Sequence, residues 1–159
     1  MDAISFVGSA KTARYAQRAT ANGKRVQALG GAKNSMVVMP DADPALMTGG
    51  VMGSAFGAAG QRCLAGSIAV LVGTPEEQDA ARDRIVAAAA KLITGPSPTP
   101  RLTSARSSPR PKRERLVCDI DRAEADGATV VLDGRGDAGA VAVRWRRRSS
   151  MTSRTVITS

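Results

Sequence analysis

The chain contains no histidine and few aromatic residues, and each absence removes a class of chemistry or packing. Without histidine it has no imidazole to serve as a general base, in a Ser–His–Asp triad or as a metal ligand. Aromatic residues make up 3% of the 159 residues, so a core must be built from aliphatic side chains. The hydrophobic content of 43% is enough to supply one.

Cysteine and long apolar runs are scarce as well. The two cysteines, Cys63 and Cys118, cannot form a disulfide framework or a cysteine zinc site, and we expect no metal. No stretch reaches the roughly 20 apolar residues of a membrane span, and residues 1–5 lack the basic and apolar regions of a signal peptide. We therefore expect a cytoplasmic chain with room for one domain and no membrane partner.

Positive charge is concentrated in the last third of the chain. Lys and Arg outnumber Asp and Glu by 23 to 14. Residues 1–100 hold 10 basic and 7 acidic side chains, whereas residues 101–159 hold 13 and 7. The run Arg144–Arg148, which includes Trp145, could grip nucleic acid through phosphate contacts and stacking. Because the run has no periodicity, we favour a solvated basic tail and expect no nucleic-acid partner.

The pattern of apolar and capping residues predicts an α/β fold. Asp43–Pro44 and Thr74–Pro75 are typical helix starts, with an N-cap residue followed by proline. Short strands alternate with helices and are apolar on both faces, which is typical of a sheet covered by helices. Strands are expected at 4–9, 25–29, 36–39, 68–72 and 128–132, and helices at 10–22, 44–59, 75–93 and 120–127.

Beyond Gly95 the composition changes. Residues 96–100 have the proline-rich composition of a linker, and residues 101–115 are Ser, Pro, Arg and Lys with little to bury. The globular pattern returns briefly and is lost again from Asp137 onward. We expect the C-terminal third to be largely irregular.

Three short segments could carry chemistry. Cys63 follows a glycine loop and precedes a strand, where its thiolate could attack a carbonyl carbon, although a free cysteine is more often a small buried hydrophobe. Gly8–Ser9 joins a strand to a helix whose first amides suit a phosphate, although Ser9 could be an ordinary N-cap. Gly30–Gly31 could bring the backbone close to a ligand or simply form a tight turn.

These segments lie within four blocks that resemble consecutive blocks of the aldehyde dehydrogenase superfamily, in the family's order and nearly at its spacing. The most specific are the Gly-Gln-Arg-Cys block and the Lys-Arg-Val-Gln…Gly-Ala-Lys-Asn block. The similarity is continuous over residues 2–96 and returns at 119–136. The four blocks are residues 5–9, 21–34, 37–43 and 55–63.

The resemblance implies that the chain is a fragment of that family's α/β fold. By this comparison, residues 1–27 are the tail of the NAD-binding domain and residues 28–100 are part of the catalytic domain. Residues 101–159 are expected to be basic, poorly ordered and partly out of frame.

The resemblance also implies site residues and an activity. Cys63 matches the nucleophile that attacks an aldehyde, after which a hydride passes to NAD and the thioester is released to coenzyme A. Gly8 and Ser9 match the turn that holds the NAD pyrophosphate, and Gly30 matches a position near the nicotinamide. The implied substrate is methylmalonate or malonate semialdehyde, in valine and pyrimidine breakdown, and members of the family form homo-oligomers.

One missing side chain favours the CoA-acylating branch of the family. Hydrolytic members carry a glutamate just before the glycine pair, and it activates the water that releases the product. Leu29 stands at that position here, and a shift by one residue gives Ala28. Because neither can act as a base, we expect CoA rather than water to resolve the thioester, and a hydrolytic remnant is disfavoured.

Much of the family's chain has no counterpart in these 159 residues, including the asparagine that stabilises the oxyanion. Its loss alone is expected to cost on the order of a hundredfold in rate, so we expect the fragment to be inactive alone. Ser35 also stands where family members have histidine. The alternative is a non-catalytic remnant whose basic tail binds an acidic partner or nucleic acid.

A reading-frame shift can explain the segments without family resemblance. With suitable codons, a shifted reading of residues 101–108 gives Ala-Asp-Ile-Gly-Pro-Val-Ile-Thr, and the same shift of residues 145–152 gives Ala-Pro-Thr-Leu-Phe-Asp-Asp-Val. Both are blocks of the family. We hypothesise that residues 101–117 and 137–159 are out-of-frame translations, so that their arginine content reflects GC-rich codons.

Overall fold

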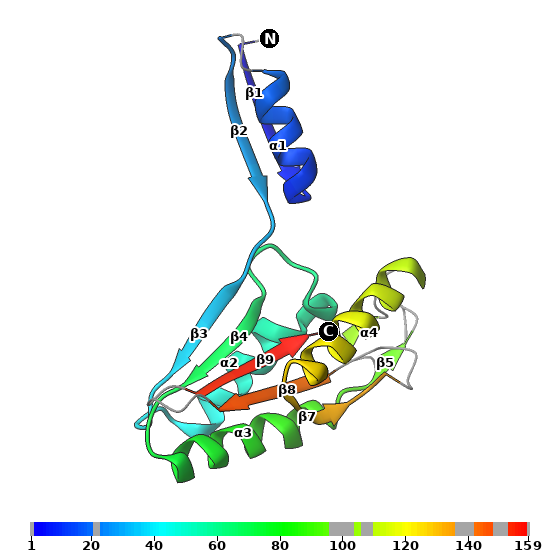
Figure 1. The fold of residues 1–159 in the computed structure, drawn as a ribbon. Helices are drawn as coiled ribbons and strands as arrows, with labels where there is room; N and C mark the ends of the chain where they lie inside the picture. The colour runs from blue at the N-terminus through cyan, green and yellow to red at the C-terminus, as the bar shows by residue number, and fades with distance from the viewer. Residues whose placement is uncertain are drawn as a thin grey trace. The chain divides into compact units, whose positions relative to one another are not determined.

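The computed structural model describes residues 2–20, 23–95, 104–105, 110–135, 142–147 and 153–158. The chain divides into two compact units, Met1–Lys33 and Asn34–Ser159 (Figure 1). This division falls after Lys33, whereas the resemblance placed a boundary after residue 27. Within the described segments, none of the helices is long and apolar enough to cross a membrane.

The first unit is a strand–helix–strand element. β1 (Ala3–Gly8) and β2 (Arg25–Gly30) pair in parallel, and α1 (Ala10–Ala19) connects them. Parallel neighbours need such a crossover, because a tight turn cannot return the chain to the same end of a sheet. α1 packs on the strand pair (Figure 1). Its buried residue is Ala13. Other apolar side chains of the unit are exposed to solvent, for example Val7 by 68%.

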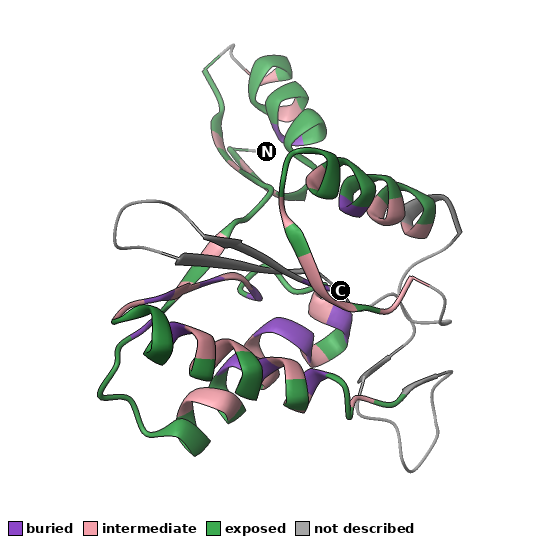
Figure 2. Cartoon of the chain, turned by 60° about the horizontal axis from the view of Figure 1, so that its bottom comes forward, coloured by how far each residue is buried: buried purple, intermediate pink, exposed green. Residues whose placement is uncertain are grey.

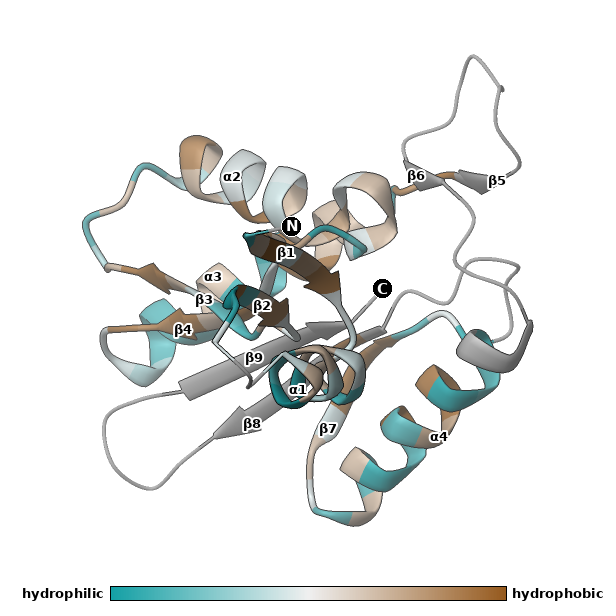
Figure 3. Cartoon of the chain, turned by 90° about the horizontal axis from the view of Figure 1, so that it is seen from above, coloured by the Kyte–Doolittle hydropathy of each residue, from teal (hydrophilic) through white to brown (hydrophobic). Residues whose placement is uncertain are grey.

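The second unit contains a five-stranded mixed sheet. Its order is β3-β4-β9-β8-β7, in which β3 and β4 are parallel and every other pair is antiparallel. Figure 3 shows β3 and β4 as apolar ribbons, which suits strands that face a core. The five strands are β3 (Asn34–Val38), β4 (Gly66–Leu71), β7 (Thr129–Asp133), β8 (Ala142–Arg147) and β9 (Ser153–Thr158).

Two helices pack together and against this sheet: α2 (Pro44–Phe56) and α3 (Pro75–Ala89). Buried residues line the facing sides of the two helices (Figure 2). Most of these core residues are aliphatic, as the scarcity of aromatic residues predicts. Its buried residues are Val38, Val51, Ala55, Phe56, Ala69, Leu71, Ile85, Ala89 and Val143.

The predicted starts of both helices are confirmed. The Asp43 carboxylate accepts hydrogen bonds from the Ala45 and Leu46 amides at 2.9 and 2.8 Å, which caps α2. In α3 the Thr74 hydroxyl and the Glu77 carboxylate each accept from the other's backbone amide, at 3.3 and 2.7 Å. These caps satisfy amides that the first helical turn leaves unpaired.

The expectation that the C-terminal third is largely irregular is wrong for its described residues, which form a helix and three strands of the sheet. α4 begins at Arg110 and runs to Ala125, and β8 and β9 complete the sheet, with β9 paired to β4. Strand ladders are made by backbone groups, so an arginine-rich run can form one if a buried position anchors it, as Val143 does. Residues 96–103, 106–109, 136–141 and 148–152 lie outside the described residues, as do the side chains of the basic run.

Arg135 joins α4 to β7 through carboxylates on both sides. Its guanidinium contacts Asp121 at 2.5 Å, Glu124 at 2.6 Å and Asp133 at 2.6 Å. The hydrogen bonds from Arg135 lower the pKa of Asp133 below its ordinary value.

The smaller elements are η1 (Gly57–Gly60), which follows α2, and the two-residue parallel strands β5 (Thr94–Gly95) and β6 (Ser104–Ala105).

Candidate active site

Cys63 lies at the tip of a tight turn of residues 62–65, the Cys63 turn, between η1 and β4. The Ala65 amide donates to the Arg62 carbonyl at 3.1 Å, which closes the turn around Cys63 and Leu64. Both central residues are exposed, Leu64 by 82%. The alternative of a small buried hydrophobe is therefore wrong for Cys63, whose thiol is open to a reactant in solution.

The segment just before this turn is wound left-handed. Ala58 has φ 52° and ψ 42°, Ala59 has φ 54° and ψ 31°, and Gly60 follows at φ 66°. The left-handed backbone conformation costs roughly 1–2 kcal/mol for each residue that has a Cβ. Ala59 is buried, and the Gln61 amide donates to the Ala58 carbonyl at 3.1 Å. Packing and hydrogen bonding thus hold a strained backbone next to the thiol, as is common at functional segments.

Arg62 ties the Cys63 turn to the end of α2. Its Nη2 donates to the Ser54 carbonyl at 3.0 Å and also to the Gly53 carbonyl. The last carbonyls of a helix lack partners within the helix and favour a cation. A Cβ at Gly57 would lie 2.7 Å from Nη2, so glycine at this position leaves room for the guanidinium.

Two more side chains contact the Cys63 turn or the residue that follows it. The side-chain amide of Asn34, the first residue of β3, donates to the Cys63 carbonyl at 2.9 Å and to the Ala65 carbonyl at 3.1 Å. The Ser54 hydroxyl accepts from the Gly66 amide at 3.0 Å. The Cys63 turn is therefore fixed by contacts from β3 and α2 together.

A surface hollow brings the thiol and a cation together. It is lined by Gly53, Ser54, Arg62, Cys63 and Leu64. The arrangement suits a small reactant with an electrophilic carbon for the thiol and a negative charge for the guanidinium. Among the described residues, no group of three or more Cys, Asp or Glu side chains could hold a metal ion.

The residues predicted to bind the cofactor lie together in the first unit. Gly8 and Gly30 are register partners at the carboxyl ends of β1 and β2. Ser9 follows Gly8 and caps α1, because its Oγ accepts from the Thr12 amide at 3.3 Å. The carboxyl ends of parallel strands beside a helix N-terminus are the usual ligand position in α/β folds.

Gly30 has a packing role of its own. A Cβ at this position would lie 2.8 Å from the Cα of Ala10, so glycine allows β2 to approach the start of α1. The N-cap alternative for Ser9 is likewise confirmed. A phosphate at the same helix terminus would meet the amides that precede Thr12, which an α-helix leaves without partners of its own.

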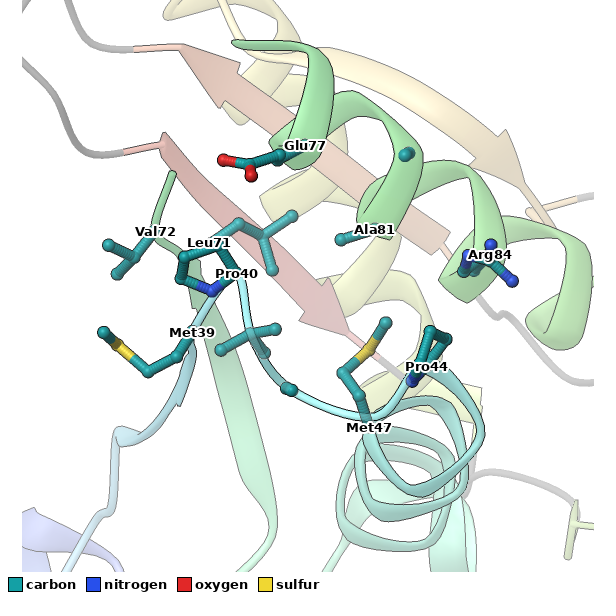
Figure 4. A pocket seen from close by; sticks show the side chains of 12 residues that line it. Met39, Pro40, Pro44, Met47, Leu71, Val72, Glu77, Ala81 and Arg84 are labelled. Atoms are coloured by element: carbon teal, nitrogen blue, oxygen red, sulfur yellow. The ribbon is translucent and has the colours of Figure 1, made fainter. Parts of the chain in front are cut away.

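A second hollow is lined mainly by apolar side chains and lies between the ends of β3 and β4 and the helices α2 and α3 (Figure 4). Met39, Met47 and Leu71 face it, with Glu77 and Arg84 from α3. It holds no nucleophile, and the Glu77 carboxylate already caps α3. The Cys63 turn, whose hollow is lined by a thiol and a guanidinium, is therefore the candidate site in the described part of the chain.

Local sequence patterns do not single out two further functional candidates, Arg62 and Asn34. Both stand inside the family-like blocks, next to Cys63 and at the end of the Gly-Ala-Lys-Asn motif. Their contacts with a turn and a helix end depend on tertiary packing, which no local pattern reveals. Only their places in those blocks could have indicated them.

Comparisons with known proteins identify the family to which the chain is similar. Residues 1–143 match the aldehyde dehydrogenase family. The chain is 43% identical over 137 residues to malonate-semialdehyde dehydrogenase 2 of Geobacillus kaustophilus (strain HTA426), covering 86% of this chain and 28% of that protein. It is 44% identical over 141 residues to the mitochondrial methylmalonate-semialdehyde/malonate-semialdehyde dehydrogenase (acylating) of Mus musculus, covering 84% and 24%.

Solved structures show the same similarity. A methylmalonate-semialdehyde dehydrogenase from Oceanimonas doudoroffii has a TM-score of 0.84 at 39% identity, covering 95% of this chain and 33% of that one. A protein described as a methylmalonate-semialdehyde dehydrogenase from Sinorhizobium meliloti, in complex with NAD, has a TM-score of 0.81 at 38% identity, covering 86% and 28%. The chain thus spans about a quarter to a third of the length of these relatives.

Proposed function

Because the chain belongs to the aldehyde dehydrogenase family, we propose that it carries the nucleophile and part of the NAD site of a CoA-acylating semialdehyde dehydrogenase. The substrate class is a short aldehyde with a carboxylate, such as malonate or methylmalonate semialdehyde, which the names of the relatives support. The observation that carries the proposal is the hollow shared by Cys63 and Arg62.

The chemistry at Cys63 begins with attack on the aldehyde carbon. The Sγ thiolate bonds to that carbon, the carbonyl oxygen takes up the electron pair of the broken π bond, and a thiohemiacetal anion results. Arg62 binds the substrate carboxylate and keeps the aldehyde within reach of the thiol. When bound, NAD supplies the acceptor for the hydride that leaves this carbon.

The resulting thioester on Cys63 is released to coenzyme A. The CoA thiolate bonds to the thioester carbon, and the Cys63 thiolate leaves with the electron pair. Leu29 and Ala28 offer no base to activate water, which supports transfer to a thiol rather than hydrolysis.

The NAD pyrophosphate is assigned to the start of α1. Gly8 and Gly30 present no side chains there, and Ser9 caps a helix of ten residues whose first amides suit an anion. These residues therefore fit the group. Turnover also needs the remainder of the family's chain, because the chain covers 24–33% of its relatives.

The test is protection of Cys63 against iodoacetamide by malonate semialdehyde, read by peptide mass spectrometry. Cys118, which is also exposed, serves as the internal reference. We expect the semialdehyde to protect Cys63 at least about tenfold better than propanal, because only the semialdehyde carries a charge for Arg62. Arg62→Gln should remove this preference, and Arg84→Gln, an exposed arginine of α3, should keep it. Equal protection by both aldehydes, or protection of both cysteines, would contradict the proposal.

A further inference from the structure

The side chain of Asn34 has an unusual set of partners. Its Nδ2 donates to two carbonyls of one turn, those of Cys63 at 2.9 Å and Ala65 at 3.1 Å. The turn lies 29 positions away in the sequence, so this contact exists only in the folded second unit. A single amide thus pairs with two backbone acceptors on both sides of Leu64, that of the exposed Cys63 and that of the buried Ala65.

The sheet is irregular at the same point. Asn34 pairs with Gly66, but the next residue, Ser35, pairs with Ile68, so one residue of β4, Ser67, has no partner in the ladder. A bulge of this kind re-aims side chains and is common beside active sites. The Ser67 hydroxyl at this bulge is buried and has no hydrogen-bond partner within the described part of the chain.

We infer that Asn34 is a positioning residue for the Cys63 thiol, an inference that rests on the function proposed above. Asn34 acts through the turn and does not touch the reacting atoms. Its two hydrogen bonds fix the peptide after Cys63, while Arg62 fixes the side before it. The thiol is thereby held in one direction at the tip of an otherwise exposed turn.

The consequence is specific to acyl transfer. Attack on a carbonyl requires the sulfur to approach the carbon along a defined direction, so a misplacement of about 1 Å can cost a hundredfold in rate. Alkylation by iodoacetamide is a simple displacement that needs only an exposed thiolate. The ratio of the two rates therefore separates the placement of the thiol from its exposure and protonation.

The experiment compares p-nitrophenyl acetate with iodoacetamide on the full 159-residue chain. In the acylation, Sγ bonds to the acetyl carbon, and p-nitrophenolate leaves with the electron pair. Both reactions are followed at Cys63 and Cys118 separately by peptide mass spectrometry. The variants are Asn34→Leu, which keeps the size and loses the donor, and Asn34→Gln, which keeps the amide. Ser35→Ala, an exposed neighbour on β3, is the matched control.

We expect Asn34→Leu to lower the acylation-to-alkylation ratio of Cys63 about tenfold or more, with Asn34→Gln restoring part of it and Ser35→Ala unchanged. If Asn34→Leu leaves the acylation-to-alkylation ratio of Cys63 unchanged, the positioning role of Asn34 is overturned, whereas the proposal that Cys63 is the nucleophile is unaffected. A Cys63 ratio in the unmodified chain no higher than that of Cys118 overturns the proposed function and the positioning role with it. If Asn34→Leu also changes the rates at Cys118, its effect is not confined to the Cys63 turn. The ratio is then measured in Asn34→Asp, whose carboxylate keeps the size of the side chain but cannot donate a hydrogen bond.

Discussion

The guanidinium of Arg62 fills the space beside Gly57 that any other residue would need for its Cβ, which would lie 2.7 Å from Nη2. Gly57 follows the last residue of α2, so the same glycine ends the helix and admits the cation that caps it. The first glycine of the Gly57–Gly60 segment is therefore needed to make room for Arg62, the residue that precedes the Cys63 thiol.

The first prediction concerns this pair. Gly57→Ala should push Arg62 away from the Gly53 and Ser54 carbonyls and destabilise the fold by about 1–2 kcal/mol, the net value of those hydrogen bonds. It should also weaken the preference of Cys63 for a carboxylate-bearing aldehyde. Urea unfolding and the protection assay measure the two effects.

The control for that variant lies in the same helix. A Cβ at Gly49 would meet nothing within 4 Å, so Gly49→Ala should stabilise α2 by roughly 0.5–1 kcal/mol and leave the protection of Cys63 unchanged. If Gly57→Ala and Gly49→Ala change the free energy of unfolding and the protection of Cys63 alike, the packing of Arg62 on Gly57 does not contribute to stability.

A second prediction tests the proposed phosphate position in the first unit. Ser9→Asp keeps a good N-cap for α1 but adds a negative charge where the pyrophosphate is assigned, so NAD binding should weaken at least about tenfold without loss of helix. Equilibrium dialysis measures the affinity. Thr74→Asp makes the same change at the N-cap of α3 and should leave NAD affinity as it was; equal weakening by both would refute the assignment.

A third prediction follows from the lowered pKa of Asp133. Its carboxyl binds protons less readily in the folded chain than in the unfolded chain, because Arg135 donates hydrogen bonds to it. The resulting stability is present above the unfolded pKa, near 4, and is lost as the pH falls through the folded value. Arg135→Gln should therefore lower the melting temperature at pH 7 and by less at pH 3.

The matched control for the pH experiment is Arg84→Gln, which removes one exposed arginine from α3. Its melting temperature should track that of the unmodified chain at both pH values. A difference between Arg135→Gln and the unmodified chain that stays constant from pH 7 to pH 3 would count against the carboxylate network.

A fourth prediction tests the corrected C-terminal third. β9 lies between β4 and β8, so a chain ending at Arg147 should lose the ladder that connects β7 and β8 to the rest of the sheet. The core residue Val143 would be exposed with it, and we expect a clearly lower melting temperature. Unchanged thermal unfolding by circular dichroism would show that the segment adds nothing, as the frame-shift hypothesis expects.

Local sequence signals predicted the helices and strands of residues 1–95 well, because capping residues such as Asp43 and Thr74 act within one turn of chain. They failed for β8 and β9, whose pairing with β4 depends on distant residues and not on composition. The site divides in the same way. Cys63, Gly8, Ser9 and Gly30 stand in recognisable blocks, whereas the contacts of Asn34 and Arg62 with the Cys63 turn are tertiary.

The most direct test of the central claim is acyl exchange between acetyl-CoA and the unmodified chain, read by peptide mass spectrometry. In this exchange Sγ of Cys63 bonds to the acetyl carbon, and the CoA thiolate leaves. We expect acetylation of Cys63 well above that of the exposed Cys118, slow loss of the acetyl group in water and rapid release on adding free CoA. Equal acetylation of the two cysteines, or release by water as fast as by CoA, would contradict it.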